Sequence, residues 1–303
     1  MRINQKQVEQ VCKRLNESLV KFSFLAKGNH NSNYLLETSW GKYIIRVEDN
    51  EQFKNLKKEY SFLKLAKKGL GPEVLFFDDS HKVISRDYLV EKFIEGKHPS
   101  EKKPTNDFII QMARWFKELH STKKRDKAYF LADKVKPYYE NYLKYKENVQ
   151  DLNLKGRLDV CIPGGLKILE KNNDVFMKRK TFSLLHNDSS SGNIFYEKGH
   201  VRLIDWEFVG WGLPESEIVY FFDSYDLTKK QQRLFLKSYG HPNTKTANLQ
   251  LNMAYVILLF SSIGYSLWRM DLVKDKRSRK EINKRLLRDT NKLNGVLKEY
   301  GKS

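Results

Sequence analysis

The sequence predicts an α+β fold with a smaller, strand-rich part at the N-terminus and a larger, mainly helical part behind it. Short β-type runs, separated by turn residues, recur through the first 96 residues. Helical periodicity dominates from residue 107 onward. Between residues 183 and 208 the helical pattern is interrupted by a polar loop and two further β-type runs. The change of pattern near residue 97 predicts the boundary between the two parts.

Apolar spacing and turn residues define the elements of the N-terminal part. The first helix carries Val8, Val11 and Leu15 on one face. The turn between the first two strands contains Gly28 and Asn31, residue types that tolerate positive φ and let a turn present its backbone N–H groups. The expected elements are, in order, a helix (residues 3–20), two strands joined by this turn (22–38), a strand (42–47), a helix ended by Gly69 (51–68) and two strands (74–77 and 88–94).

Helices with apolar stripes make up most of the C-terminal part. The lysine-rich stretch 121–180 contains two of them, and the sequence does not fix its role. The longest uncharged run, residues 251–268, includes several polar residues and is shorter than the roughly 20 apolar residues of a membrane span. We therefore expect a buried core helix there and no membrane partner. The expected helices cover residues 107–120, about 133–148, about 163–173, 228–239, 246–271 and 276–299.

Composition narrows the class of protein. The two cysteines, Cys12 and Cys161, are far apart and in no C-x-x-C spacing, which argues against a disulfide framework or a zinc site and favours a reducing, cytoplasmic setting. The N-terminus does not have the pattern of a signal peptide, because no apolar stretch follows its first charges. The net charge of +19 has two explanations: a solvated lysine-rich surface, which is the plainer one, or an anionic substrate, up to RNA.

The stretch 183–208 carries the strongest chemical signal. It contains His186, Asp188 and Asn193 in the pattern H-x-D-x-x-x-x-N, followed by an apolar run that ends in Asp205. A turn at residues 197–200 separates two β-type runs, so a hairpin is expected to bring Asp205 back beside Asn193 and Asp188.

Phosphoryl transfer needs this combination of groups. The attacking hydroxyl needs a carboxylate that orients it and accepts its proton, and Asp188 fits that role. The Mg²⁺ that accompanies a nucleoside triphosphate takes oxygen ligands, and Asn193 and Asp205 fit that role while leaving open positions for phosphate oxygens. The alternative interpretation is a polar turn with a solvated Asp-Ser-Ser-Ser run.

These residues resemble the catalytic and metal loops of the aminoglycoside/choline kinase family, the small-molecule branch of the protein-kinase-like fold. Asp205 is followed by Trp206 and Glu207 where protein kinases have D-F-G, which points to the small-molecule branch. The resemblance extends over roughly residues 22–222. It implies an α+β, two-lobed protein-kinase-like fold, with a small N-lobe (residues 1–96) of antiparallel sheet plus one helix, and a larger, mainly helical C-lobe (residues 97–303).

The resemblance also implies roles for residues of the N-lobe. The turn at Gly28 and Asn31 is similar to the G-x-x-N turn of choline and thiamine kinases and would cover the nucleotide phosphates. Arg46 stands where protein kinases place their phosphate-binding lysine, and its arginine is common in choline kinases. Glu59, on the helix that follows, would be the partner of Arg46.

Three further residues receive roles from the same resemblance. Main-chain groups near Glu91 and Phe93 would contact the edge of a purine. His186 would hold the catalytic loop in shape by hydrogen bonding. Glu217 stands where the family usually has an aspartate that braces this loop, and its longer side chain puts that role in doubt.

The implied reaction is the transfer of the γ-phosphate of ATP, or of GTP, to a hydroxyl group with Mg²⁺ as cofactor. The acceptor stays open: the net charge argues mildly against polycationic aminoglycosides, while choline, another small alcohol, a sugar or an anionic metabolite fit. One alternative is a kinase that acts on RNA, such as tRNA, or on another macromolecule. The other is a catalytically silent binding protein, against which the intact Asp188, Asn193 and Asp205 argue. The sequence leaves the oligomeric state undetermined.

Overall fold

The computed structural model describes residues 2–28, 30–49, 55–101, 103–125, 131–177, 179–197 and 199–300. Its contacts divide the chain into two compact units, which are described separately. The first unit comprises residues 1–124, 183–212 and 221–240, and the second comprises residues 125–182, 213–220 and 241–303. The predicted lobe boundary near residue 97 stays a prediction.

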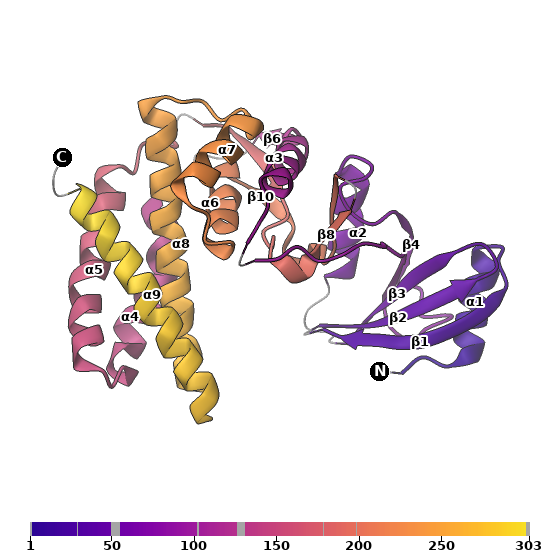
Figure 1. Ribbon diagram of the computed structural model, residues 1–303. Coiled ribbons are helices and arrows are strands. Elements are labelled where there is room, and N and C mark those ends of the chain that lie inside the picture. Colours follow the sequence, from indigo (N-terminus) through magenta and orange to yellow (C-terminus); the bar gives the residue numbers. More distant parts are fainter. Residues whose placement is uncertain are drawn as a thin grey trace. The chain divides into compact units, whose positions relative to one another are not determined.

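An antiparallel five-stranded sheet forms the N-terminal region of the first unit (Figure 1). Its strand order is β1-β2-β3-β5-β4, so the pairing of β3 with β5 is the one that joins strands not consecutive in this sheet's sequence order. The elements of this region are α1 (Gln5–Arg14), β1 (Leu19–Lys27), β2 (Asn31–Thr38), β3 (Lys42–Glu48), α2 (Leu56–Leu65), β4 (Val74–Asp78) and β5 (Tyr88–Lys92).

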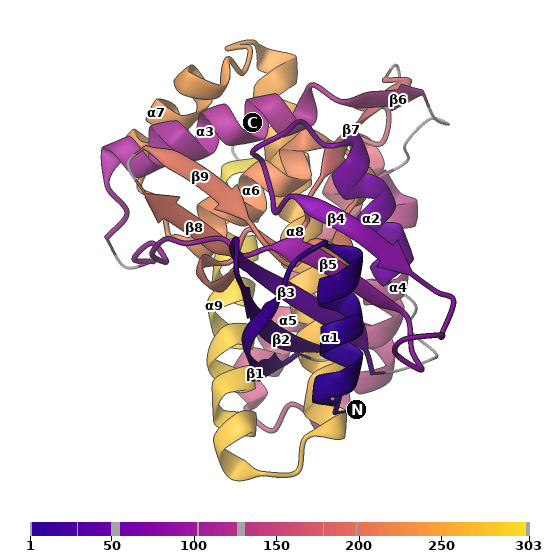
Figure 2. The same ribbon diagram turned by 90° about the vertical axis from the view of Figure 1, so that its right-hand side faces the viewer.

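Helix α1 covers one face of this sheet (Figure 2). Its buried Val8 and Val11 pack against alternate residues of the central strands, among them Leu36 and Ile45. Because side chains alternate between the two faces of a strand, the residues between these, such as Arg46, point to the opposite face. The core under α1 thus leaves the other face of the sheet available for a site.

Two predicted helix boundaries in this region are wrong. The first helix was expected over residues 3–20 but ends at Arg14, because Asn16 takes a positive φ of 57° and the chain enters β1 at Leu19. The second helix ends at Leu65 rather than at residue 68, with Ala66 already extended. The expected start of that helix, residues 51–54, lies outside the described residues.

The rest of the first unit places a hairpin and two packed helices beside the sheet region. The hairpin strands, β8 and β9, pair in the register Ile194↔Leu203, which confirms the hairpin expected from the sequence. Helices α3 and α7 pack through rings such as Phe116 and Phe235, whose centroids lie 5.7 Å apart. The elements are α3 (Asn106–His120), β8 (Ile194–Glu197), β9 (His200–Leu203), α7 (Lys229–Tyr239) and a small sheet of order β10-β7-β6, made of β6 (Lys123–Arg125), β7 (Thr181–Leu185) and β10 (Gly210–Gly212).

Long helices make up the second unit, and α6 (Pro214–Ser224) links it to the first. Helix α8 packs against α4 and α9, and α5 packs against α9 (Figure 1). The approach of α8 to α4 depends on Gly264, since a Cβ there would lie 2.8 Å from the Cβ of Tyr138. The helices of this unit are α4 (Leu131–Tyr145), α5 (Leu152–Lys171), α8 (Lys245–Leu272) and α9 (Lys276–Tyr300).

Helix α5 corrects another prediction. The sequence suggested a helix at about residues 163–173, but α5 begins at Leu152, behind an Asp151 cap, and contains Pro163 in its interior. Gly165 lies so close to Phe260 that a Cβ there would come within 2.6 Å of that ring. Tertiary packing therefore overrides the low helix propensity of proline and glycine in this segment.

Helix α8 is the one helix in the described part of the chain that is long and apolar enough to cross a membrane. In the structure 61% of its most apolar window is buried inside the protein. Core helices of soluble proteins meet the same criteria of length and composition, and the expected buried core helix is what this segment forms.

Candidate active site

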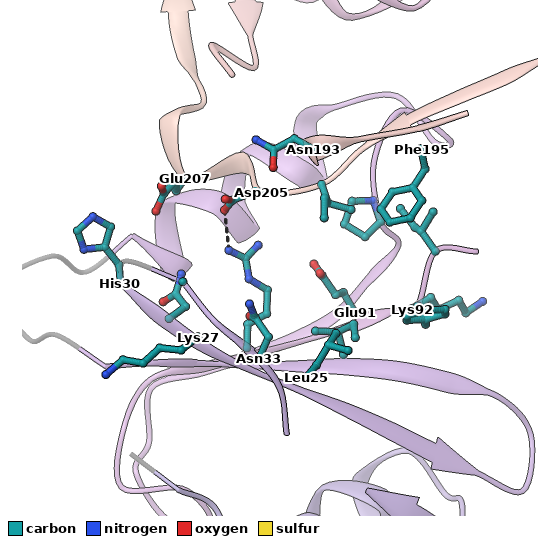
Figure 3. A pocket seen from close by; sticks show the side chains of 18 residues that line it. Leu25, Lys27, His30, Asn33, Glu91, Lys92, Asn193, Phe195, Asp205 and Glu207 are labelled. Atoms are coloured by element: carbon teal, nitrogen blue, oxygen red, sulfur yellow. Dashed lines mark hydrogen bonds and ion pairs between the residues drawn. The ribbon is translucent and has the colours of Figure 1, made fainter. Parts of the chain in front are cut away.

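A cavity of about 380 Å³ lies on the face of the sheet opposite α1. The register pairs Asn33 with Arg46 and Ile44 with Glu91, so these four side chains share that face. The hairpin contributes Asn193 and Asp205 to the same cavity (Figure 3). Seven of the ten residues proposed from the sequence line it: Gly28, Asn31, Arg46, Glu91, Phe93, Asn193 and Asp205.

Arg46 is held between two carboxylates from distant parts of the chain. Its Nη1 donates to Oε1 of Glu59, on α2, which is the pair expected from the sequence. Its Nη2 donates to Oδ1 of Asp205 at 3.0 Å. Glu59 is fully buried and also accepts the backbone N–H of Trp206 at 3.1 Å, which ties α2 to the segment that carries Asp205.

Asp188 is oriented by the loop that contains it. The backbone N–H of Ser190 donates to its Oδ1 at 3.3 Å, and the side-chain Nδ2 of Asn193 donates to its Oδ2 at 2.8 Å. The Asn193 Nδ2 is thereby directed at Asp188, and Figure 3 shows its Oδ1 directed into the cavity. One amide therefore connects the predicted general base to the predicted metal site.

His186 lies buried under this loop. Its Nδ1 accepts the backbone N–H of Asp188 at 3.3 Å, and its Nε2 lies 3.0 Å from the carbonyl oxygen of Ile204. This pattern requires the tautomer with the proton on Nε2. The ring joins the residue before Asp205 to Asp188 itself, so its geometry fits the loop-holding role implied by the sequence.

Two residues of the site have left-handed backbone conformations. Asp205 has a φ of 63°, and Asn187 has a φ of 68° while its Nδ2 donates to the carbonyl of Phe208 at 2.9 Å. The next residue, Trp206, is buried: its indole N–H donates to the carbonyl of Leu203 at 2.8 Å, and a Cβ at Gly71 would lie 2.7 Å from the indole nitrogen. Such conformations are costly and persist where packing enforces them, most often at functional sites.

The charges in the cavity alter one another's pKa values. Burial alone would lower the pKa of Arg46, but Glu59, Glu91 and Asp205 outweigh this and raise it, so the guanidinium stays charged. Burial raises the pKa of Glu91 to about 8, with Glu59 and Asp205 acting in the same direction and Arg46 opposing them. Burial also raises the pKa of Glu207, again with help from Asp205.

The turn at Gly28 and Asn31 borders the cavity. The Gly28 N–H donates to the carbonyl of Asn31 at 2.8 Å and closes the turn. The side-chain Oδ1 of Asn31 is buried and has no hydrogen-bond partner among the described residues. The position of this turn fits the phosphate-covering role implied by the sequence.

Two backbone N–H groups at the end of β5 are hydrogen-bonded to residues beside the neighbouring strands. The N–H of Lys92 donates to the carbonyl of Glu73 at 2.9 Å, and the N–H of Phe93 donates to the carbonyl of Lys42 at 3.0 Å. Main-chain contact with a purine near Glu91 and Phe93 stays a prediction, and these two N–H groups are already used within the protein.

Sequence reasoning missed several residues of the cavity, among them Lys27, His30, Asn33 and Glu207. Two of them had a detectable signal. Asn33 lies two residues after Asn31 on the same strand face, and Glu207 lies two residues after Asp205. Lys27 precedes the turn that the sequence did single out and His30 lies within it, but nothing in their own context marks them.

The donor atoms of this site suit a hard divalent cation. The Oδ1 of Asn193 and the carboxylate of Asp205, whose side chain is 37% exposed, offer the oxygen ligands that Mg²⁺ prefers. The described residues contain no group of three or more His, Cys, Asp or Glu side chains that would hold a metal ion on their own. Such a cation would therefore need oxygen atoms from a bound ligand to complete its coordination.

Comparison with known proteins adds a family and a set of structures. Residues 21–248 match the family described as "Phosphotransferase enzyme family". Two curated relatives are both named "Protein LicA homolog". The one from Metamycoplasma hominis is 25% identical over 52% of this chain, a match that spans only 59% of that relative's length. The one from Mycoplasma capricolum is 21% identical over 78% of this chain and 87% of its own length.

Solved structures with the same fold cover nearly the whole chain. An ADP-bound aminoglycoside phosphotransferase superposes with a TM-score of 0.64 at 19% identity, over 96% of this chain and 99% of the other. The choline kinase LicA from Streptococcus pneumoniae superposes with a TM-score of 0.64 at 17% identity, over 98% of this chain and 99% of the other. These likenesses confirm the kinase-like fold, with its antiparallel N-terminal sheet and helical C-terminal part, that the sequence predicts.

Proposed function

Because this chain belongs to the phosphotransferase enzyme family, we propose that it transfers the γ-phosphate of ATP to a hydroxyl group of a small molecule. One observation carries the proposal more than any other. Asn193 is hydrogen-bonded to Asp188 and shares a single cavity with Asp205, which is itself paired with Arg46. The residues proposed as general base, as ligands of a cation and as phosphate-binding cation are thus joined by contacts, which supports the proposal.

Asp188 orients the hydroxyl of the acceptor and takes its proton. The contacts from Ser190 and Asn193 hold both carboxylate oxygens in place, so the group needs little rearrangement before it acts. Holding reacting groups in place supplies much of the rate in phosphoryl transfer. His186 contributes by fixing the backbone of Asp188, not by touching the substrate.

Arg46 binds the phosphates of the nucleotide, and Glu59 sets its orientation. An arginine presents donors in a fixed planar fork, which suits phosphate oxygens. The turn at Gly28 and Asn31 covers the phosphates from the sheet side.

Mg²⁺ fits the site, with Asn193 and Asp205 as its protein ligands. When bound, it neutralises the negative charge that accumulates on the phosphate oxygens. The pairing of Asp205 with Arg46 keeps that carboxylate at the cavity surface. The nucleotide-bound relatives among the solved structures support nucleotide binding in this fold.

A small alcohol is the acceptor that we favour. The named relatives act on two classes of compound, since one structure is a choline kinase and another an aminoglycoside phosphotransferase. Aminoglycosides are polycations, and a chain of net charge +19 is a poor partner for them. Choline, other small alcohols, sugars and anionic metabolites stay as candidates.

A panel of acceptors incubated with ATP labelled in its γ-phosphate tests the proposal. The panel includes choline, ethanolamine, simple sugars, aminoglycosides and bulk tRNA. We expect Mg²⁺-dependent transfer of label to at least one small hydroxyl compound. Tight ATP binding with transfer to none of them, and no hydrolysis, would instead favour the catalytically silent binding protein.

A polyanionic acceptor such as RNA is the second candidate, and a cavity in the second unit favours it. This cavity has a volume of about 640 Å³ and lies between the start of α5 and the start of α9. Binding of tRNA that weakens steeply with salt, together with transfer of label to it, would support this candidate. The basic residues that line the cavity are Lys274, Lys276, Arg279, Lys280 and Lys284, against the single acidic residue Asp151.

A further inference from the structure

The cavity of the first unit has an apolar side and a polar side. Figure 3 shows Leu25 and Phe195 on one side, together with Glu91 and Lys92, and it shows Lys27, His30 and Glu207 on the other. A planar nucleobase fits against apolar and aromatic walls, while phosphates fit beside cations. The apolar side is therefore the place for the base if the cavity binds a nucleotide as proposed above.

Glu91 places a carboxyl group on this largely apolar side of the cavity. Its side chain is 4% exposed, and its Oε2 is buried with no hydrogen-bond partner in the described part of the chain. The strand register sets it directly opposite Ile44. Buried polar atoms in proteins nearly always have partners, so this one needs an explanation.

The charged groups around Glu91 do not supply that explanation. Arg46 on β3, Glu59 on α2 and Asp205 after β9 all influence it electrostatically. Arg46 nevertheless directs its hydrogen bonds to the other two carboxylates, at Glu59 and Asp205. The Glu91 carboxyl group thus faces the cavity with hydrogen-bonding capacity that no residue of the described chain uses.

Two hydrogen-bond donors of the neighbouring backbone are already used within the protein. The N–H groups of Lys92 and Phe93 are used in hydrogen bonds to Glu73 and Lys42. A side chain can therefore add to hydrogen-bonding recognition of the base on this side. Of the two charged residues there, Lys92 pairs with Glu73 at 3.0 Å, which leaves Glu91.

We propose that the Glu91 carboxyl group contacts the nucleobase and selects adenine over guanine. The inference rests on the proposed nucleotide site, and it adds a specificity-determining residue to it. Adenine presents an N6 amino donor beside the N7 acceptor, whereas guanine presents two acceptors, O6 and N7, at the same edge. A protonated carboxyl group offers one acceptor and one donor, which matches both atoms of adenine and only one of guanine.

The protonation state supports this match. Burial raises the pKa of Glu91 to about 8, so its neutral form dominates near pH 7. A neutral carboxyl group and the amide of glutamine share the same pattern of one acceptor and one donor on nearly the same shape. Glutamine is therefore a functional mimic, and leucine is a mimic of shape alone.

Direct binding of ADP and GDP to three forms of the protein tests the proposal at about pH 6.5. Titration calorimetry with Mg²⁺ gives the ratio of the two dissociation constants for the wild type, Glu91→Gln and Glu91→Leu. We expect the wild type to prefer ADP by at least roughly tenfold, which is within the range for a bidentate base contact. Glu91→Gln keeps that ratio within about threefold, and Glu91→Leu brings it close to one.

Several results would overturn the proposal. Equal binding of ADP and GDP by the wild type would do so, as would an unchanged ratio in Glu91→Leu. If Glu91 only supports Arg46, Glu91→Leu weakens both nucleotides equally and leaves the ratio as it was. The proposal would also be contradicted if Glu91→Gln lost the preference for ADP as completely as Glu91→Leu.

A variation of the ligand keeps the test valid if Glu91→Leu folds poorly. ADP and 7-deaza-ADP differ only in the N7 acceptor, so the wild type should bind 7-deaza-ADP on the order of tenfold more weakly. Glu91→Gln should show the same loss, whereas undiminished binding of 7-deaza-ADP would contradict the contact. These are binding measurements, so they test base recognition separately from phosphotransfer. If only the proposed phosphotransfer is wrong, ADP would still bind selectively and no acceptor would gain label.

Discussion

At the scale of single residues, Asn193 links the two halves of the proposed chemistry. Its Nδ2 fixes the carboxylate of Asp188 at 2.8 Å, and its Oδ1 faces the cavity that Asp205 also borders. Replacing Asn193 would therefore affect both sides at once, whereas a replacement of Asp188 that keeps the shape of its side chain affects the base alone. Variants that separate catalysis from nucleotide binding are therefore the informative ones.

The variant Asp188→Asn removes the base while keeping the shape of the side chain. We expect the turnover rate to fall by about a thousandfold, the mid-range effect of losing a positioned general base, with ADP affinity unchanged within about twofold. Glu197→Gln, an exposed carboxylate on the same hairpin, is the matched control and should keep full activity. Turnover rates and ADP titrations of each variant test this prediction. Equal losses of rate and of ADP affinity in Asp188→Asn would count against Asp188 as the general base.

The buried pair of Arg46 and Glu59 makes a separate prediction. Glu59→Leu leaves the buried Arg46 with Asp205 alone, so we expect the free energy of unfolding to fall by about 3 kcal/mol. The double variant Arg46→Met with Glu59→Leu removes both charges and should recover much of that stability, because no unpaired buried charge is left.

Chemical unfolding measures the effect of this pair on stability, and ADP titration measures its effect on nucleotide binding. The double variant should be stable and yet bind ADP at least roughly tenfold more weakly than the wild type, since it lacks the phosphate-binding cation. Wild-type affinity for ADP in the double variant would show that Arg46 does not bind the phosphates.

At the scale of elements, sequence periodicity located most helices and strands but not their ends. The strand register that puts Asn33, Arg46 and Glu91 on one face follows from alternation and could be anticipated once the strands were aligned. The burial of Glu91 could not be anticipated in this way, because it depends on α2 and on the hairpin, which pack next to the sheet. The end of α1 depends on a left-handed Asn16, and the start of α5 depends on packing at Gly165, neither of which is visible in apolar spacing.

Helix α1 is joined to the sheet by a cluster that depends on pH. Burial alone would raise the pKa of Asp78, but hydrogen bonds from Ser80, and then from Arg14 and Tyr88, outweigh it and lower the pKa to about 2. A carboxyl group with a lowered folded-state pKa contributes stability above its unfolded value of 3.8, and this contribution is lost as the pH falls toward 2.

The variant Asp78→Asn should therefore cost about 2 kcal/mol of unfolding free energy near pH 6 and little near pH 2. Denaturant unfolding of the wild type and the variant across this pH range measures the difference. A cost that stays constant from pH 6 to pH 2 would mean that the charge of Asp78 is not what stabilises this cluster. Asp79→Asn, an exposed neighbour, serves as control and should show little effect at any pH.

The close approach of α8 to α4 gives a matched pair of glycine variants. A Cβ at Gly264 would lie 2.8 Å from the Cβ of Tyr138 and 2.9 Å from its Cα, so Gly264→Ala should destabilise the second unit by about 2 kcal/mol. Gly295, on α9, has nothing within 4 Å of the same position. Gly295→Ala should be neutral or stabilise by up to about 1 kcal/mol, because alanine favours a helix. Equal effects of the two variants in thermal unfolding would contradict this packing.

At the scale of the whole molecule, the chain combines a family-wide fold with features of its own. The sequence predicted the succession of strands and helices along the chain, because local spacing determines it. It also showed the motif formed by His186, Asp188, Asn193 and Asp205. The identity of the acceptor could not be predicted from the sequence, because specificity depends on side chains that many segments contribute. The net charge of +19 acts at this scale too, and it bears on partners and solubility without fixing either.

The most direct measurement of the central claim follows a heavy-isotope γ-phosphate into an untargeted mixture of small molecules. The protein is incubated with Mg²⁺, γ-¹⁸O-labelled ATP and a small-molecule extract, and mass spectrometry detects new phosphate monoesters. We predict that one or a few hydroxyl compounds gain the heavy phosphate and that Asp188→Asn, which still binds ADP, gives none. Label that enters no compound with the wild type, or that enters equally with Asp188→Asn, would contradict the account.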